Sequence, residues 1–447
     1  MKSALQRGTA NRSEHDPRTA ALRIIDQTLS GNEPSQMLLD KALRESVMVP
    51  SDKGLCTELV YGFLRNAVRL DWNIRRLLRE PDKLPDEMVL VLELAAYEIA
   101  HLRIPAHASV NWAVSRVRNR FGKGLSGVAN GVLRAFARDV KGYKDETHYT
   151  NALGPVAGLA VFYAVPEWIV HLWLDAYGET KTRAYLEGSA SPAVPAVRVN
   201  ASRDDAATVR GDLMNTGQSE ARTIGPWGLA FPTGVPYIAR GLEKEGRLSY
   251  QTAAIQELFV ETDMLSWPSP VWDACAGRGG KTAAMLERGV AVSLASDIAA
   301  GRISSLDDEL ERLGIAPDFR PVVLEADAAD LPDSPAFAEP FGTVLLDVPC
   351  SGLGTLARRP EIRFRRTAED IAELTVIQDG ILDAAGRRVR SDGRIVYITC
   401  TLSPTENEER VKAFLDRTPG FVLDKEWSTP PHSPWHEFFY TAILRKI

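Results

Sequence analysis

Residues 271–282 read VWDACAGRGGKT, and this stretch decides the fold of the last part of the chain. It begins with an apolar run typical of a buried strand, and its glycines then predict a turn into a helix over residues 283–288. Glycines let the backbone approach a ligand closely, and a helix start offers free N–H groups. Because strand and helix patterns alternate through residues 251–447, we expect a parallel, doubly wound sheet.

Acidic residues stand where the next strands end. The strand predicted over residues 290–295 is followed by Asp297, the strand over 321–325 by Asp327, and a later apolar run by Asp347. Open sheets of this kind bind ligands at the carboxyl ends of their strands. Asp297 stands where ribose hydroxyls would lie, and Asp327 could accept from an adenine amino group. A single such acid is more often a helix cap or a surface charge, but three at successive strand ends favour a nucleoside site.

Two cysteines also end apolar, β-branched runs. Cys350 lies in DVPCSG (residues 347–352), and Cys400 lies in VYITCTLS (residues 396–403). One thiol can add to an electron-poor ring and the other can assist the return step, so a pair facing one cleft indicates covalent catalysis. An isolated cysteine is more often a small buried hydrophobe, and here the flanking motifs decide against that interpretation.

The composition is that of a globular protein with more than one domain. The chain has 447 residues, which exceeds a single core, and its apolar and charged fractions are 45% and 25%. No apolar stretch approaches the roughly 18 residues that span a bilayer, and the first residues lack a signal-peptide core. We therefore expect a cytoplasmic protein with no membrane partner. The four cysteines form no Cys-x-x-Cys pair, so neither a disulfide framework nor a metal site is expected.

The amino-terminal part is helical and basic. Apolar residues recur every three or four positions, which predicts an all-α domain over residues 17–145 behind a flexible segment at 1–16. Residues 1–140 contain 21 Lys and Arg against 16 Asp and Glu, whereas the remainder contains 32 against 43. This excess favours a polyanionic partner only slightly. Some arginines here are expected to contact phosphates and others to solvate helix faces: Arg65, Arg69, Arg75, Arg76, Arg79, Arg116, Arg118, Arg120, Arg134 and Arg138.

Between the two ends, residues 146–250 are predicted to form a linker and a small α/β module. Polar residues and glycines over 142–155 indicate the linker. Strands are predicted over 196–200, 221–224 and 229–231, with a helix over 204–215 capped by Asp204. Because the module has no aromatic-rich strand that would stack bases, we interpret it as a spacer and positioning element.

Several motifs resemble those of one family. DACAGRGGKT (273–282), DVPCSG (347–352), RRPEIR (358–363) and TCT followed by ENE (399–401, 406–408) are similar to motifs of the bacterial RsmB (Fmu/Sun) ribosomal RNA cytosine-5 methyltransferases, within the wider Nol1/Nop2/Sun group. DKGLCTELVYGFLR (52–65), RIPAHA (103–108) and NGVLR (130–134) resemble a NusB-type RNA-binding domain. The resemblance runs from near residue 17 to the end. It implies a NusB-like helical domain, the small module, and a Rossmann-like, S-adenosylmethionine-dependent methyltransferase domain with a mostly parallel seven-stranded sheet.

The resemblance also implies the chemistry, which is methyl transfer from S-adenosylmethionine to carbon 5 of a cytosine in small-subunit ribosomal RNA. Carbon 5 becomes nucleophilic only after a thiolate adds at carbon 6. By resemblance Cys400 is that thiolate, Asp347 hydrogen-bonds the nitrogen edge of the ring, and Cys350 helps remove the carbon 5 proton. DNA cytosine-5 methyltransferases use the Pro-Cys residue as the nucleophile, so an exchange of roles stays open. The residues that match cofactor contacts are Cys275, Ala276, Gly277, Arg278, Gly279, Gly280, Lys281, Asp297, Asp327 and Asp347.

Four places depart from the family pattern. Arg278 stands for a proline, Thr252 for an aspartate, Phe364 for a tryptophan, and His436-Glu437 for Asp-Gly. These changes bear on cofactor affinity and RNA fit more than on the reaction. Arginines beyond Cys350 are expected to hold the phosphates of a strand whose target base is turned out of its stack: Arg358, Arg359, Arg363, Arg365 and Arg366.

Other functions remain to be separated from this one. The same chemistry on transfer RNA or DNA is the main alternative, and a non-catalytic NusB-like RNA-binding adaptor is another, although both cysteines and the glycine loop are present. A nicotinamide-dependent oxidoreductase is disfavoured because the loop lacks the G-x-G-x-x-G spacing. We expect a monomer that binds S-adenosylmethionine and RNA.

Overall fold

The computed structural model describes residues 16–31, 33–217 and 220–447. The described residues up to Pro192 form one compact unit together with Leu356–Arg365, which we call the helical unit. Ala193–Thr355 and Arg366–Ile447 form a second, which we call the sheet unit. The flexible segment predicted at residues 1–16 lies outside the described residues, apart from Asp16, whose side chain caps the first described helix.

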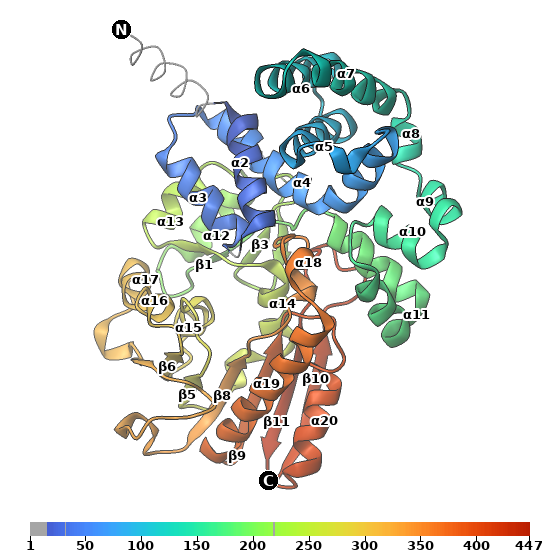
Figure 1. Cartoon of the computed structure of the whole chain (residues 1–447). Coiled ribbons are helices and arrows are strands. Elements are labelled where there is room, and N and C mark those ends of the chain that lie inside the picture. Colours follow the sequence, from blue (N-terminus) through green and yellow to red (C-terminus); the bar gives the residue numbers. More distant parts are fainter. Residues whose placement is uncertain (1–15, 32, 218–219) are drawn as a thin grey trace. The chain divides into compact units, whose positions relative to one another are not determined.

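The helical unit consists of helices (Figure 1), and those from α2 to α8 share one hydrophobic core. Helix α5 is buried almost all round, as its continuous apolar sequence requires. The all-α character predicted for this part of the chain is confirmed. The helices of the unit are α2 (Pro17–Ser30), α3 (Ser35–Glu45), α4 (Pro50–Leu77), α5 (Asp86–His101), α6 (Ala106–Phe121), α7 (Lys123–Arg138), α8 (Val140–Tyr143), α9 (Glu146–Leu153), α10 (Pro155–Phe162), α11 (Glu167–Ala190) and α18 (Ile362–Arg365).

The linker predicted over residues 142–155 is wrong, because this segment forms α8, α9 and the start of α10. Tyr149 is fully buried, and its hydroxyl donates to the carbonyl of Tyr143 at 2.9 Å. Gly154 has a φ of +87° and forms the turn between two helices, so the glycine marks a helix boundary here. Across the described parts of the chain no single helix is long and apolar enough to cross a membrane, although the bent pair α10 and α11 passes on length and composition together.

The sheet unit begins with a small antiparallel sheet of strand order β2-β3-β1-β4. The strands predicted over 196–200, 221–224 and 229–231 are confirmed as three strands of this sheet, whereas the fourth, β4, was not predicted. The cap predicted at Asp204 is wrong: Asp205 precedes the helix and forms an ion pair with Arg247 at 2.5 Å. The module contains β1 (Ala196–Val199), α12 (Ala206–Met214), β2 (Arg222–Ile224), β3 (Gly228–Ala230), α13 (Ala239–Lys244) and β4 (Leu248–Tyr250).

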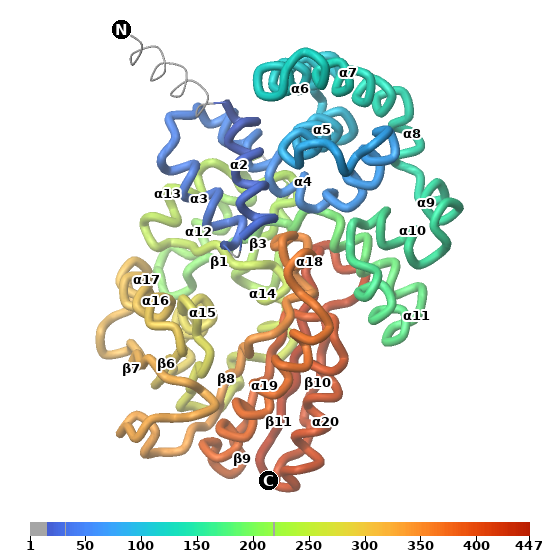
Figure 2. Tube along the Cα trace, viewed as in Figure 1, coloured from blue at the N-terminus to red at the C-terminus, as the bar shows by residue number. Residues whose placement is uncertain are grey.

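The large sheet has seven strands in the order β10-β11-β9-β8-β5-β6-β7, which confirms the mostly parallel sheet expected. The five strands from β5 to β9 pair in parallel, whereas β11 pairs antiparallel with β9 and β10. The last strand, drawn in red in Figure 2, therefore lies between two earlier ones. The strands are β5 (Val271–Asp273), β6 (Val292–Asp297), β7 (Val322–Glu325), β8 (Phe341–Asp347), β9 (Val389–Thr399), β10 (Phe421–Ser428) and β11 (Tyr440–Lys446).

Alternate residues of these strands enter two cores on opposite faces of the sheet. Leu345 packs in the core with α14 (Ala253–Glu261), α15 (Gly280–Leu286), α16 (Ala300–Ile303) and α17 (Leu306–Leu313). Its neighbours Val344 and Leu346 pack in the core with α19 (Ala368–Arg388) and α20 (Glu408–Arg417). From β5 the chain runs outward through β6 to β7 and then returns to β8 on the other side of β5, so the strand order reverses between β5 and β8. Ligands of such sheets bind at the carboxyl ends of the strands beside this reversal.

Candidate active site

The two cysteines predicted to share a site lie side by side. Strands β8 and β9 are parallel neighbours, with Asp347 opposite Ile398, so the loops that follow them leave the same edge of the sheet. The Sγ atoms of Cys350 and Cys400 are 3.3 Å apart. The backbone N–H of Cys400 also donates to the Cys350 Sγ at 3.3 Å. The prediction that both cysteines face one place is therefore confirmed.

The environment of Cys350 favours its protonated form. The side-chain hydrogen bond with Cys400 raises the pKa of the Cys350 thiol well above its ordinary value, and burial raises it further. Negative charge on Cys400 and on Glu406 acts in the same direction, whereas the N–H bond from Cys400 opposes it. Cys350 thus carries its proton at neutral pH in this structure.

Lys281 lies close to the cysteines and to the predicted acid Asp347. It is the second residue of α15, and its ammonium donates to Asp347. Burial acts to lower the pKa of Lys281, but the charge of Asp347 and the bond to it outweigh burial and raise that pKa. A negative charge on Cys400 also raises it, so the ammonium lies within electrostatic reach of the Cys400 sulfur.

The glycine loop joins β5 to α15 in a conformation that only glycine adopts easily. Gly277 and Gly279 have φ angles of +59° and +80°. A Cβ on Gly279 would lie 2.1 Å from the Cδ1 of Leu306, so a larger residue would require the Leu306 side chain to shift. The N–H of Gly277 donates to Asp297 at 2.9 Å, which ties the loop to the end of β6. Arg278 is exposed.

Four carboxylates surround the start of this loop. Burial raises the pKa of the Cys275 thiol well above its ordinary value, and the charges of Asp273, Asp347, Asp297 and Asp327 raise it further. The structure therefore brings together the three acids predicted at strand ends and adds a fourth. Asp297 is buried, whereas Asp327 is exposed.

The predicted acids Asp297 and Asp327 also hold local backbone. The Asp297 carboxylate oxygen that does not bond Gly277 accepts the N–H of Ala299 at 2.9 Å. A carboxylate oxygen of Asp327 accepts the N–H of Ala329 at 2.9 Å. Bonds of this kind fix the turn that follows each strand. Both acids therefore shape the loops that a nucleoside would meet.

Asp273 is the acid that the sequence analysis did not include among the site residues. Its carboxylate is fully buried, and burial raises its pKa to about 6. The hydroxyl of Thr282 donates to this carboxylate at 2.7 Å, and that hydrogen bond acts to lower the pKa. The Oδ1 atom has no hydrogen-bond partner among the described residues. An orphaned buried carboxylate oxygen beside a glycine loop suits a cationic or N–H-bearing ligand. Its place at the end of β5, matching the other acids, is the signal that could have identified it.

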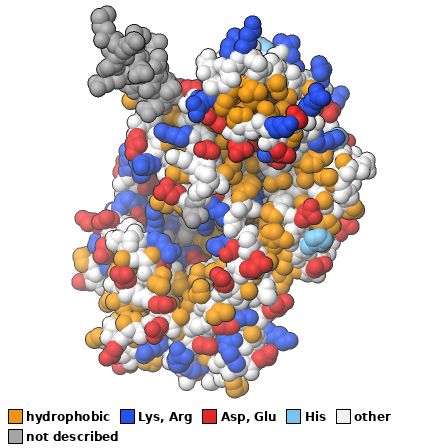
Figure 3. Space-filling view, in the orientation of Figure 1, with side chains coloured by type: hydrophobic (Ala, Val, Ile, Leu, Met, Phe, Trp, Pro, Cys, Tyr) orange, Lys and Arg blue, Asp and Glu red, His pale blue; other side chains and the backbone are white. Residues whose placement is uncertain are grey.

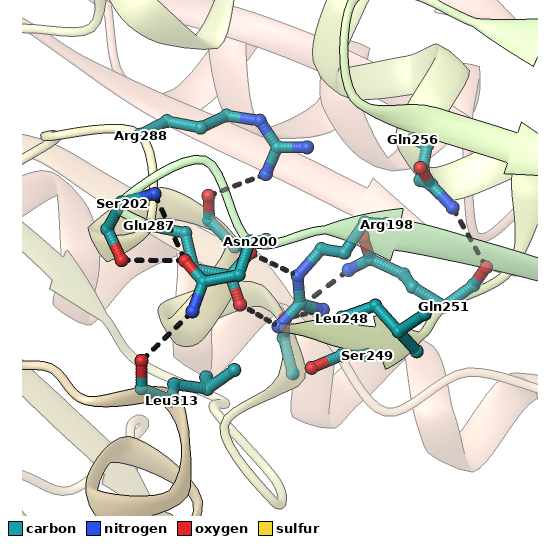
Figure 4. A network of polar contacts seen from close by, with 12 residues as sticks. Arg198, Asn200, Ser202, Leu248, Ser249, Gln251, Gln256, Glu287, Arg288 and Leu313 are labelled. Atoms are coloured by element: carbon teal, nitrogen blue, oxygen red, sulfur yellow. Dashed lines mark hydrogen bonds and ion pairs between the residues drawn. The ribbon is translucent and has the colours of Figure 1, made fainter. Parts of the chain in front are cut away.

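The small module supports the same loop through Arg198 (Figure 4). Arg198 of β1 forms a bidentate pair with Glu287, at 2.8 and 2.9 Å, and both side chains are almost fully buried. Its third nitrogen donates to the carbonyl of Gly280 at 3.2 Å, and Gln251 donates to the same carbonyl at 3.3 Å. The module thus contacts both ends of α15, which agrees with a positioning element.

The arginines expected to hold RNA phosphates beyond Cys350 need a correction. Arg363 is fully buried in the helical unit and donates to the carbonyls of Arg65, Ala164, Ser189 and Leu356, at 2.8 to 3.3 Å. Burial lowers the pKa of this guanidinium to about 9. Its backbone contacts leave it no access to a phosphate.

The two arginines that follow are also used internally. Arg365 donates to the carbonyls of Thr28 and Glu33 within the helical unit, and Arg366 donates to the carbonyl of Ser351 within the sheet unit. Arg358 and Arg359 are exposed, so the phosphate prediction stays for these two.

The arginines of the helical unit also fall into two groups: some are held by contacts within the protein, and others are exposed. Arg65 is buried, and the guanidinium of Arg69 lies 4.5 Å from the centre of the Tyr143 ring, so neither is a free surface charge. Arg75 pairs with Asp71. Figure 3 shows basic side chains along the part of the helical unit formed by α6 and α7. The exposed basic residues of these two helices are Arg118, Arg120, Lys123, Arg134 and Arg138.

Two of the four departures from the family pattern contact each other. The hydroxyl of Thr252 donates to the carboxylate of Glu437, which is buried. A carboxylate is thus present beside position 252, although it belongs to another residue.

Both parts of the chain match known protein families. The family profile described as 16S rRNA methyltransferase RsmB/F matches residues 267–435, and the NusB family profile matches residues 15–138. Ribosomal RNA small subunit methyltransferase B of Vibrio vulnificus (strain YJ016) is 33% identical over 442 residues, which cover 96% of this chain and 99% of the relative. The protein of the same name from Escherichia coli O6:K15:H31 is 31% identical and covers 97% and 100%.

Solved structures share the fold. The crystal structure of PH0851 has a TM-score of 0.73 and 23% identity, and covers 96% of this chain and 99% of its own. The structure of NSun6 from Pyrococcus horikoshii with SFG has a TM-score of 0.54 and 20% identity, and covers 63% and 98%.

The fold and the matched profiles define an S-adenosylmethionine-dependent methyltransferase with a NusB domain at its amino end. The chain belongs to the RsmB/F family of ribosomal RNA small subunit methyltransferases. Its cofactor is S-adenosylmethionine, and the residues present fit that group. The sulfonium of this cofactor is a cation, and the glycine loop combines accessible backbone with clustered carboxylates, one of which has an orphaned oxygen.

Proposed function

We propose that the protein methylates carbon 5 of a cytosine in small-subunit ribosomal RNA through a covalent adduct with Cys400, released with help from Cys350. One observation carries the proposal: the Cys350 and Cys400 sulfurs lie 3.3 Å apart at the ends of adjacent parallel strands. The ammonium of Lys281, which pairs with Asp347, is within electrostatic reach of Cys400. Two thiols at one sheet edge suit addition to a ring and its reversal.

The cofactor side of the site is assigned to the glycine loop and the acids. S-adenosylmethionine, when bound, supplies a methyl group on a cationic sulfur. The loop from Cys275 to Lys281 would hold it through backbone groups, with Asp297 and Asp327 next to the nucleoside. The negative charges of Asp273 and Asp347 favour a cation there.

In the addition step Cys400 acts as the nucleophile. Its thiol gives its proton to water, and its sulfur forms a bond to carbon 6 of the cytosine, which moves the electron pair of the 5,6 double bond towards carbon 5. Asp347 would hydrogen-bond the nitrogen edge of the ring and promote this shift. Lys281 keeps Asp347 oriented and keeps positive charge near the Cys400 sulfur.

In the release step Cys350 acts as the base. The Cys350 thiol first gives its own proton to water. After the methyl group has joined carbon 5, the resulting thiolate accepts the carbon 5 proton. The freed electron pair restores the 5,6 double bond, and the bond between carbon 6 and the Cys400 sulfur breaks. The raised pKa of Cys350 makes its thiolate, once formed, a stronger base for this proton.

The RNA substrate is supported by the family and by surface charge. The similar curated proteins are named for small-subunit ribosomal RNA. Exposed arginines on α6 and α7 offer phosphate contacts, and Arg358 and Arg359 add two more close in sequence to Cys350. A base must leave its stack to reach both cysteines.

The direct test is to incubate the protein and labelled S-adenosylmethionine with unmodified small-subunit ribosomal RNA, transfer RNA and DNA, then to identify the nucleosides after digestion. We expect 5-methylcytidine in ribosomal RNA. Cys400→Ala should abolish it, and Cys56→Ala is the matched control because Cys56 is buried in the helical core. Label only in transfer RNA or DNA would contradict the substrate, and cofactor binding without methylation of any nucleic acid would favour the adaptor function.

A further inference from the structure

A buried carboxylate joins the two loops that carry the cysteines. Glu406 lies between β9 and α20 and is fully buried. Its Oε1 accepts the N–H of Ser351 at 2.7 Å, and its Oε2 accepts the Ser351 hydroxyl at 2.5 Å. The hydroxyl of Thr401 donates to the same Oε2 at 3.3 Å. Ser351 directly follows Cys350 and Thr401 directly follows Cys400, so one carboxylate bonds the neighbours of both cysteines.

Gln378 holds the other side of Cys350. It is fully buried on α19, and its Nε2 donates to the carbonyl of Pro349 at 2.9 Å and to Glu406 at 3.2 Å. Pro349 directly precedes Cys350. The residues on both sides of this cysteine are therefore tied to the same carboxylate, one directly and one through an amide.

Asn407 bonds the residues on both sides of Cys400. Its Oδ1 accepts the hydroxyl of Thr399, and its Nδ2 donates to the carbonyl of Thr401 at 3.1 Å. These two residues flank Cys400. The hydroxyl of Tyr397 donates to the carbonyl of Glu406 at 2.7 Å, which anchors Glu406 and Asn407 to β9.

The donors to Glu406 are neutral groups: an N–H, two hydroxyls and an amide. A carboxylate only accepts when ionised, so these bonds agree with a charged Glu406. Hydrogen bonds of this kind are strong inside a protein because the surroundings are weakly polarisable. The network therefore resists the separation of the two cysteine loops, and it places a negative charge near Cys350.

We propose that Glu406 is a positioning residue for the methyl transfer: its carboxylate sets the approach of the Cys350 and Cys400 sulfurs, with Gln378 as its support. This inference rests on the proposed function of the two cysteines. Catalysis that uses both sulfurs on one ring needs them at a fixed separation, and a misplacement of about 1 Å can cost roughly 100-fold in rate.

Two substitutions separate the geometry of the network from its charge. In Glu406→Gln the amide would keep the shape, because the hydroxyls of Ser351 and Thr401 can accept as well as donate. Glu406→Ala removes both the bonds and the charge. Glu409→Gln is the matched control, since Glu409 is exposed on the following helix.

The first readout is steady-state methylation of ribosomal RNA. We expect Glu406→Ala to lower kcat about 100-fold while the KM for S-adenosylmethionine changes less than about threefold, because the cofactor loop is not part of this network. Glu409→Gln should behave as the unaltered protein. In Glu406→Gln the pH profile of Cys350 alkylation by iodoacetamide should shift to lower pH, because the Glu406 charge no longer raises the pKa of that thiol. A merely structural role would not move this profile.

The second readout needs no RNA. Diamide takes two protons and two electrons from a pair of thiols and is reduced to its hydrazine as the disulfide forms, so the rate of Cys350–Cys400 linkage reports how closely the sulfurs are held. We expect Glu406→Ala to slow this linkage by at least about tenfold, as judged by mass spectrometry of the linked peptides.

The outcomes are distinguishable. Unchanged kcat, alkylation profile and diamide rate in both Glu406 variants would overturn the inference. If Glu406→Ala does not fold, the alkylation profile of Glu406→Gln decides the inference together with the kcat and diamide rate of Gln378→Ala, which removes the bonds that tie Pro349 to Glu406. If the unaltered protein methylates nothing, the proposed function fails, while the diamide rate still tests whether Glu406 holds the sulfurs together.

Discussion

Arg198→Met is the most informative change in the small module, because it removes the interaction of that module with both ends of α15. Arg198 forms two bonds to Glu287 and one to the Gly280 carbonyl, all at a site almost closed to solvent. The methionine fills much of the same space but leaves the Glu287 carboxylate buried without its guanidinium. The change therefore tests whether the module supports the cofactor loop.

The expected cost follows from that burial. Removing one partner of a buried pair destabilises by about 3–5 kcal/mol, because the remaining charge is left uncompensated. Each 1.4 kcal/mol corresponds to a factor of ten in an equilibrium, so hydrogen-exchange protection of residues 280–287 should fall by about 100- to 1,000-fold. Arg247→Met is the matched control: Arg247 pairs with Asp205 at 30% and 43% side-chain exposure, and exposed pairs contribute about 0–1 kcal/mol.

A double variant separates stability from cofactor binding. Arg198→Met with Glu287→Met replaces the pair by apolar groups and should regain most of the protection, since such replacements are often neutral. Its affinity for S-adenosylmethionine should stay reduced, because the Gly280 carbonyl has lost the bond from Arg198 and keeps only the bond from Gln251. Protection in Arg198→Met equal to that in Arg247→Met would refute this reasoning. Full cofactor affinity in both the single and the double variant, as measured by calorimetry, would refute it as well.

Three further changes test other parts of the account. Burial raises the pKa of Asp273 to about 6, and a nearby cation favours its ionised form, so the Kd of S-adenosylmethionine should fall as pH rises from about 5 to about 7. A flat pH profile would contradict this, and so would the same profile in Asp273→Asn or with S-adenosylhomocysteine, whose sulfur carries no charge. Arg363→Met removes four hydrogen bonds to carbonyls, so amide hydrogen exchange of residues 356–365 should become at least about tenfold faster. Arg359→Met is the control and should leave this rate unchanged, because Arg359 is exposed. Arg118 and Arg134 are exposed on α6 and α7. Replacing both by alanine should reduce the slope of log RNA affinity against log salt concentration by about one for each phosphate that is no longer neutralised. An unchanged slope in a filter-binding assay would show that these two arginines do not contact RNA phosphates.

The parts predicted well from the sequence are those that local patterns determine. The glycine loop, the acids at strand ends and the two cysteines follow from short strand and turn signals, because parallel strands carry their carboxyl ends to one edge. The juxtaposition of Cys350 and Cys400 needed only that their strands be neighbours. The seven-stranded sheet and the NusB-like helices also followed, with the family resemblance adding what alternation alone does not give.

The parts predicted poorly depend on contacts between distant segments. The run around Arg363 has the composition of a charged surface, but its guanidinium is surrounded by carbonyls from residues far apart in the sequence. Glycines and polar residues over 142–155 have the composition of a linker, yet buried Tyr149 fastens that segment to the helical core. Glu406 was visible in a motif, but its role emerges only when both cysteine loops meet its carboxylate.

The central claim is that Cys400 attacks the base and Cys350 releases it. The most direct measurement is to incubate Cys400→Ala and Cys350→Ala separately with labelled S-adenosylmethionine and unmodified small-subunit ribosomal RNA, then to resolve free from protein-linked RNA on a denaturing gel. We expect a methylated protein–RNA adduct in Cys350→Ala and none in Cys400→Ala. An adduct in Cys400→Ala and none in Cys350→Ala would contradict it and make Cys350 the nucleophile.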